Sequence, residues 1–136
     1  MHEWSLAEAV LKSSIKEAKK RSLKKLLEVK IVLGDLQGIE EEIVKFGLES
    51  LKKGTMAEEA DFIFTKEDAA FQCRNCQYAW NLKDMNLNNE TIRESIHFVP
   101  EVVHSFIRCP ACGSPDFEVI KGRGIYIEEI TGEDEE

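Results

Sequence analysis

Two groups of residues in this 136-residue chain have the side-chain chemistry and spacing to bind metal ions. One is a set of four cysteines in two Cys-x-x-Cys pairs, and the other is the Met-His-Glu sequence at the start of the chain. A Cys-x-x-Cys pair lets two thiolates on one tight turn face a single ion, and two pairs complete the tetrahedral sulfur shell that zinc prefers. The predicted zinc ligands are Cys73, Cys76, Cys109 and Cys112.

Other uses of these cysteines remain open on the sequence alone. A thioredoxin-like redox site uses a single Cys-x-x-Cys at the start of a helix, whereas both pairs here lie in strand-and-turn sequence. Disulfides would require an oxidising compartment, and unpaired core cysteines are a further alternative. If zinc is bound, sulfur fills all four positions, so the ion is structural, because catalytic zinc keeps one position open.

The start of the chain has the donors of a chelate for a second metal. The amine of Met1, the backbone amide of His2 and its imidazole fill three of the four positions around a square-planar ion such as Ni(II) or Cu(II). The amide or the carboxylate of Glu3, or a ligand from elsewhere in the chain, would complete the set. An open fourth position makes the ion exchangeable, which suits a carrier. An ordinary surface histidine is the alternative interpretation of His2.

Hydrophobic periodicity predicts the elements that hold these donors. Segment 5–25 is predicted to be an amphipathic helix, with Trp4 and Leu11 on its apolar face. Ser5 and Glu8 fit a capping box, which would place the first four residues just outside the helix as an ordered leader.

Strands and a second helix are expected to follow. Segment 40–54 is acidic in its first turn and ends in lysines and a glycine, as is typical of a helix. Alternation predicts one strand before it and another at 60–65. The residues predicted to share one face of the first strand are Leu27, Val29, Ile31 and Leu33.

Together these elements predict an α+β fold, with a small domain of two helices and a sheet of three or more strands, plus a zinc-ribbon-like module. The nickel-binding domain is expected to cover residues 1–68, completed by strands within 117–131. The zinc-binding module is expected to cover residues 69–116, and residues 132–136 form an acidic tail.

The composition restricts the classes of partner. The chain is 43% hydrophobic and 32% charged, with a formal net charge of −8. This balance argues against the basic surface that nucleic-acid binding needs. The sequence has no apolar run long enough for a transmembrane helix, and the acidic residues near its start do not fit a signal peptide. We therefore expect a cytoplasmic protein that binds neither membrane nor nucleic acid.

The MHEWSL start, the IVLGDLQGI segment and the closing RCPACGSPDFEVIKGRGIYI together resemble the HypA family of hydrogenase nickel-insertion proteins over essentially the whole chain. The long separation of the cysteine pairs, together with the charged composition, resembles the archaeal form. The resemblance implies a nickel metallochaperone, not an enzyme, that delivers Ni(II) to the large subunit of NiFe hydrogenase together with the GTPase HypB. It also implies that His2 binds nickel, supported by Met1 and Glu3, and that the cysteines bind zinc.

Two further expectations concern the histidines between the cysteine pairs. The resemblance to archaeal members implies that His97 can fill the fourth nickel position, whereas a packed side chain beside Phe98 is the alternative. His104 is expected to be structural.

The rival function is a zinc-ribbon adaptor that binds nucleic acid or transcription machinery. The sequence leaves two questions open: whether the protein forms a homodimer, and whether it also delivers nickel to urease.

Overall fold

The computed structural model describes residues 2–85 and 90–134, which form two compact units. Among these residues, unit 1 contains 2–32, 40–65 and 125–134, and unit 2 contains 33–39 together with 66–124 apart from the undescribed positions. Each unit is therefore assembled from segments that are distant in the sequence. No helix in the described part of the chain has the length and apolar character needed to cross a bilayer.

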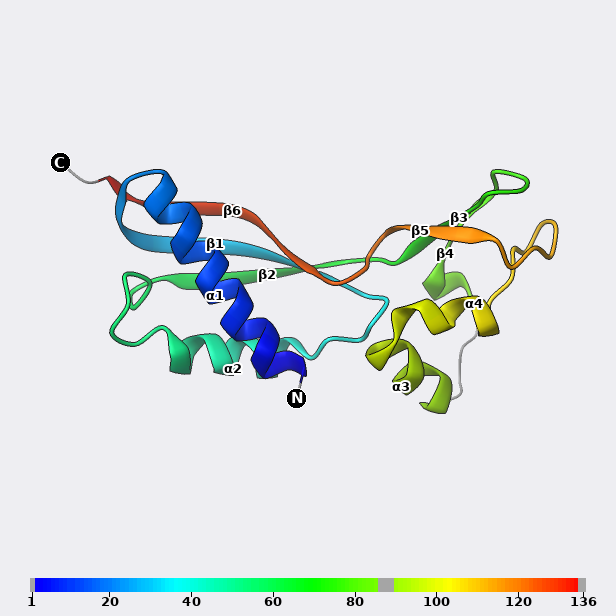
Figure 1. Cartoon of the computed structure of the whole chain (residues 1–136), viewed down its shortest axis with the longest axis horizontal. Helices are drawn as coiled ribbons and strands as arrows, with labels where there is room; N and C mark the ends of the chain where they lie inside the picture. Colours follow the sequence, from blue (N-terminus) through cyan, green and yellow to red (C-terminus); the bar gives the residue numbers. More distant parts are fainter. Residues whose placement is uncertain (1, 86–89, 135–136) are drawn as a thin grey trace. The chain divides into compact units, whose positions relative to one another are not determined.

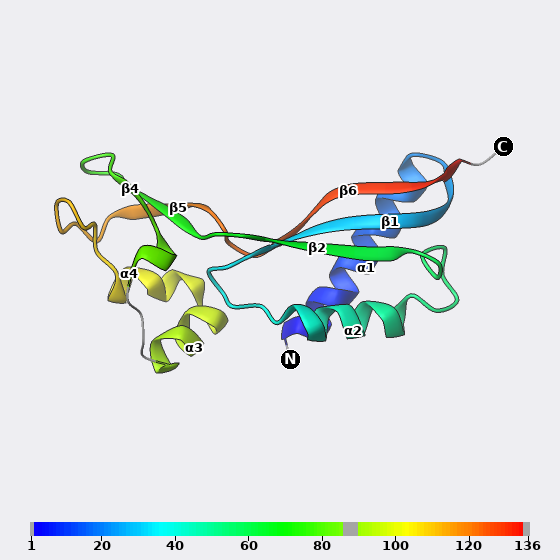
Figure 2. The same cartoon turned by 180° about the vertical axis from the view of Figure 1, so that it is seen from behind.

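Unit 1 packs two helices with a three-stranded sheet. Its helices are α1 (His2–Lys20) and α2 (Glu41–Leu51). The strands lie in the order β2-β1-β6, and α1 crosses one face of this sheet (Figures 1 and 2). The strand bounds are β1 Leu23–Gly34, β2 Asp61–Glu67 and β6 Ile125–Asp134.

The two helices of unit 1 approach each other closely because a glycine lies at their contact. A Cβ atom on Gly47 would lie only 2.8 Å from Cβ of Ala7 and 3.2 Å from Cε3 of Trp4. The Trp4 side chain packs against this point but remains 41% exposed. The prediction that Trp4 is a core residue was therefore wrong. Leu11, from the same predicted face, is buried as expected.

Strand β1 supplies most of the sheet's buried side chains, and the first of them is one residue earlier than the sequence predicted. Val29 and Ile31 are buried, as expected from the alternation. Leu27 is exposed, and Leu26 is buried in its place, with its N–H bonded to the Met56 carbonyl at 2.9 Å.

Unit 2 is an antiparallel sheet with short helices. Its strand order is β4-β3-β5, with Cα of Phe71 opposite Trp80 and Cys73 opposite Phe117. The buried side chains of these strands form the core together with residues from the helical insertion. The element bounds are β3 Ala70–Cys73, β4 Ala79–Asn81, η1 Leu82–Asp84, α3 Glu90–Phe98, η2 Pro100–Val102, α4 Val103–Phe106 and β5 Phe117–Lys121.

The α+β fold class was predicted correctly, but the segment expected to complete the first sheet is divided. Phe117–Lys121 pairs with β3 in unit 2, and only β6 joins the first sheet. Strand β6 also continues to Asp134, so most of the predicted acidic tail is sheet, while 135–136 lie outside the described residues. The assignment of nickel and zinc to separate domains remains a prediction.

Candidate metal sites

The four cysteine sulfurs of unit 2 lie together, with all Sγ atoms within 4.8 Å of one another. The Sγ–Sγ distance is 3.6 Å between Cys73 and Cys112, and also between Cys76 and Cys109. A tetrahedral zinc ion with Zn–S bonds of about 2.3 Å places its sulfurs roughly 3.8 Å apart. The donor set and its spacing therefore fit zinc.

Each Cys-x-x-Cys pair forms the same kind of turn around its first sulfur. Sγ of Cys73 accepts the N–H groups of Asn75 and Cys76 at 3.3 and 3.4 Å. Sγ of Cys109 accepts those of Ala111 and Cys112 at 3.4 and 3.5 Å. These donors stabilise negative charge on sulfur, which is the form that binds a metal.

A residue with positive φ closes each turn. Gly113 (φ 77°) donates its N–H to the carbonyl of Cys109 at 2.8 Å, and Gln77 (φ 70°) donates to the carbonyl of Cys73 at 3.0 Å. Glycine adopts this conformation without steric cost, whereas glutamine does not. The second turn is therefore encoded more strongly by the sequence than the first.

The four thiols differ in environment. Cys73 and Cys109 are buried, whereas Cys76 and Cys112 are exposed. The side-chain amide of Asn75 donates to Sγ of Cys112 at 3.6 Å and, with the Ser114 backbone N–H, lowers the pKa of Cys112 to about 6. At Cys76 the Tyr78 backbone N–H lowers the pKa, but desolvation and the neighbouring thiols outweigh it and raise the value to about 12. Cys112 is thus the first of these two to become a thiolate.

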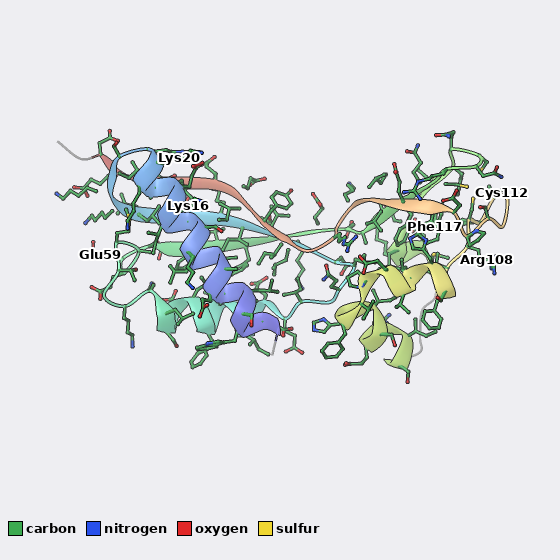
Figure 3. The ribbon with its side chains drawn as sticks, in the orientation of Figure 1. Lys16, Lys20, Glu59, Arg108, Cys112 and Phe117 are labelled. Atoms are coloured by element: carbon green, nitrogen blue, oxygen red, sulfur yellow. The ribbon has the colours of Figure 1, made fainter. Side chains whose placement is uncertain are left out.

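Aromatic packing holds the cysteine turns in place. The ring of Phe117 lies 5.2 Å from that of Phe71 and 5.4 Å from that of Trp80, measured between centroids. Figure 3 shows Phe117 beside the loop that carries Cys112. The His104 ring lies 4.3 Å from Phe117, and its Nδ1 is 3.2 Å from the Pro115 carbonyl oxygen. These contacts are in keeping with the structural role expected of His104, although the residue is exposed.

At the other candidate site, the chain is helical from its second residue. Helix α1 starts at His2, so the predicted cap at Ser5 and the predicted non-helical leader were wrong. The first N–H groups of a helix have no partner within the helix, so helical hydrogen bonding does not engage the amides of His2 and Glu3. Met1 and the side chain of His2 lie outside the described residues.

The Glu3 carboxylate lies inside unit 1. The residue is only 5% exposed, and its Oε2 accepts the backbone N–H of Glu40, the N-cap residue of α2, at 3.2 Å. A carboxylate at a helix N-terminus is stabilised by the helix dipole. Glu3 therefore joins the start of α1 to the start of α2. The sequence analysis did not identify Glu40, because no local pattern connects residues so far apart.

His97 lies in unit 2, whereas His2 lies in unit 1. Nδ1 of His97 contacts the carbonyl oxygen of Gln37, and its ring meets that of Phe98 edge-on at 5.1 Å. The Gln37 side chain accepts the N–H of Gly124 at 2.6 Å, which fixes the loop that His97 contacts. The role of His97 as a nickel ligand remains a prediction.

Comparison with known proteins decides the family. Residues 1–132 match the family model described as "Hydrogenase/urease nickel incorporation, metallochaperone, hypA". The chain belongs to the HypA family. It is 51% identical to the hydrogenase maturation factor HypA of Pyrococcus abyssi over 137 residues, covering 100% of this chain and 99% of that protein. Identity to the Caldanaerobacter subterraneus HypA is 34%, covering 96% and 97% of the two chains.

The fold is also that of known HypA proteins. The solution structure of the Ni metallochaperone HypA from Helicobacter pylori matches with a TM-score of 0.67 at 14% identity, covering 98% of each chain. The prediction of an archaeal-type HypA was confirmed by relatives from Pyrococcus and Thermococcus that are 51% and 49% identical to this chain. The chain is thus a nickel metallochaperone of this family, and its four cysteines fit structural zinc.

Proposed function

We propose that this HypA delivers Ni(II) to the large subunit of NiFe hydrogenase during maturation, in the cytoplasm and together with the GTPase HypB. The observation that carries the proposal is the full-length match to relatives named as hydrogenase maturation factors. The family description also names urease, so a urease apoprotein is a second recipient to be tested. No observation favours the alternative of a nucleic-acid-binding adaptor.

The two metals have separate ligands in this proposal. Zinc is held by Cys73, Cys76, Cys109 and Cys112, whose sulfurs fit a complete tetrahedral shell. Because no coordination position is left open, zinc is not the metal ion that is delivered. Its contribution is the folding energy of unit 2, on the order of 10 kcal/mol for structural zinc. Nickel therefore binds elsewhere, and the start of α1 supplies the donors.

For nickel, we propose the amine of Met1, the amide and imidazole of His2 and the backbone amide of Glu3. The Glu3 carboxylate, left open as a donor by the sequence, is engaged by the N–H of Glu40 and acts as an anchor. His97 competes with the Glu3 amide for the fourth position. Ligation through Nδ1 of His97 would require giving up its contact with the Gln37 carbonyl.

Nickel titration followed by isothermal calorimetry tests this assignment. The untagged protein is compared with a version that carries two extra residues before Met1, and with His2→Ala. Both changes are expected to abolish high-affinity nickel binding while zinc content stays unchanged, because each removes part of the chelate. His104→Ala is the matched control, since His104 packs on Phe117 in unit 2.

His97→Ala addresses the fourth ligand separately. A change in the spectrum of bound nickel would place His97 on the ion, and an unchanged spectrum would favour the Glu3 amide. Equal nickel affinity in the native and extended proteins would contradict the chelate at the start of the chain.

A further inference from the structure

Unit 1 has an exposed apolar area beside the proposed nickel ligands. Phe46 is 67% exposed, although it lies in the middle of α2, and Ile43, one turn earlier, is 40% exposed. The ring of Trp4 on α1 lies 6.1 Å from that of Phe46, measured between centroids. We call Trp4, Ile43 and Phe46 the helix-pair surface.

Ile43 and Phe46 are not among the side chains that α2 buries within unit 1. Helix α2 buries Val44, Gly47 and Leu48 within unit 1, on a different face from Phe46. Exposed aromatic side chains are typical anchors of protein interfaces, where their burial contributes a large share of the binding energy. The helix-pair surface is thus placed to bind a protein.

Several acidic residues lie near this surface, with the exposed Lys45 of α2 among them. Glu40 and Glu42 are exposed at the start of α2, and Glu8 on α1 is 54% exposed in its ion pair with Lys12. The lysines of α1 concentrate instead toward its other end, where Figure 3 shows Lys16 and Lys20. A complementary partner therefore presents apolar side chains flanked by lysine or arginine.

We propose that the helix-pair surface docks a partner protein through a basic, apolar segment, and that this docking brings the partner to the nickel-bearing start of α1. The second step rests on the proposed function, because Trp4 follows the proposed ligand His2 by two positions in the same helical turn. A second copy of this chain fits less well. Two such surfaces facing each other would bring like charges together at Glu40 and Glu42.

Binding measurements with two purified probes test the docking. The probes are the GTPase HypB and the nickel-free hydrogenase large subunit from the organism that encodes this chain, each titrated against the zinc-loaded protein. Phe46→Gln is expected to weaken the binding of at least one probe by about tenfold or more, as removal of an interface anchor does. Ile63→Gln is the control, because Ile63 is also an exposed apolar residue, as exposed as Ile43 at 40%, but lies on β2; it should leave affinity within about twofold.

Charge reversal tests the contribution of the acidic residues near the helix-pair surface. Glu42→Lys is expected to lower the affinity for the same probe and to reduce the salt dependence of its binding. Glu128→Lys, at an exposed position on β6, makes the same change in net charge and should have little effect.

Three results would overturn the docking proposal. They are unchanged affinity of both probes for Phe46→Gln, equal losses for Phe46→Gln and Ile63→Gln, and failure of both probes to bind the wild-type chain. Sedimentation showing a wild-type dimer that Phe46→Gln dissociates would assign the surface to a second copy instead. Nickel titration of the same samples separates this from the proposed function, since Phe46→Gln should retain its nickel and zinc.

Discussion

Replacing the Glu3 carboxylate by an amide distinguishes a side chain that anchors α1 from one that binds nickel. In Glu3→Gln the side chain keeps its size and can still accept the N–H of Glu40, which lies 3.2 Å from Oε2. A hydrogen bond to a charged group is worth about 1.5–3 kcal/mol and a neutral one about 0.5–1.5 kcal/mol. The favourable interaction with the dipole of α2 adds about 0.3–1 kcal/mol. The substitution should therefore destabilise the contact by about 1–2 kcal/mol.

Hydrogen exchange at the start of α2 measures this loss directly. A loss of 1–2 kcal/mol corresponds to exchange about 5–30 times faster at the Glu40 amide, which donates this hydrogen bond at the start of α2. Glu8→Gln is the matched control in the same helix, because Glu8 is 54% exposed and pairs with the exposed Lys12 across one turn. Such a pair contributes little, so exchange in α2 should be unchanged.

Nickel titration of Glu3→Gln supplies the second readout. If the backbone amide of Glu3 is the donor, the variant still binds one nickel ion, with affinity lowered only through the less firmly held start of α1. Loss of nickel binding together with unchanged exchange in α2 would refute the anchoring role, and would return the carboxylate to the nickel ligand set.

Three further changes have expected outcomes. Gly47→Ala should lower the stability of unit 1 in thermal melts by about 1–3 kcal/mol, because the new methyl group meets Cβ of Ala7 at 2.8 Å. Adding Ala7→Gly should restore most of this loss. A failure to restore it would contradict the contact between the two helices. The lowered pKa of Cys112, about 6, favours its thiolate above that pH, and the thiolate is lost as the pH falls below it. Zinc should therefore be released on acidification, measured with a chromogenic chelator, and Asn75→Ala should move the release midpoint to higher pH; an unmoved midpoint would contradict the role of that amide. Phe117→Ala should destabilise unit 2 by about 3–5 kcal/mol in urea unfolding, because a fully buried ring is removed; a change below about 1 kcal/mol would show that the core can close over the gap.

The cluster of four cysteines could be predicted from the sequence because much of its geometry is encoded locally. A Cys-x-x-Cys turn brings its own two sulfurs together, and Gly113 supplies the positive φ that closes the second turn. The pairing of the two turns is long-range, but the tetrahedral preference of zinc leaves few ways to combine them. The positions of the donors were therefore predictable, unlike the difference in pKa between Cys76 and Cys112, which depends on Asn75 across the site.

The errors arose where a contact between distant segments overruled a local pattern. Ser5 and Glu8 predict a helix start by the capping-box rule. The helix instead begins at His2, and the carboxylate next to it bonds to Glu40. Periodicity likewise cannot show that a helix contact closes on Gly47, which leaves much of Trp4 in solvent. Phe117–Lys121 has the alternation of a strand, but only the three-dimensional pairing shows which sheet it joins.

The interleaving of the two units determines the order in which the chain can fold as it is synthesised. All four cysteines and β5 are made before β6, so the sheet of unit 2 has all its strands while the sheet of unit 1 still lacks one edge. Strand β6 then completes the sheet that α1 covers, although α1 was the first element to be made. The four cysteines are thus available to a zinc ion before unit 1 is finished. This order would favour early binding of zinc by the thiols and late completion of unit 1, which holds the proposed nickel ligands.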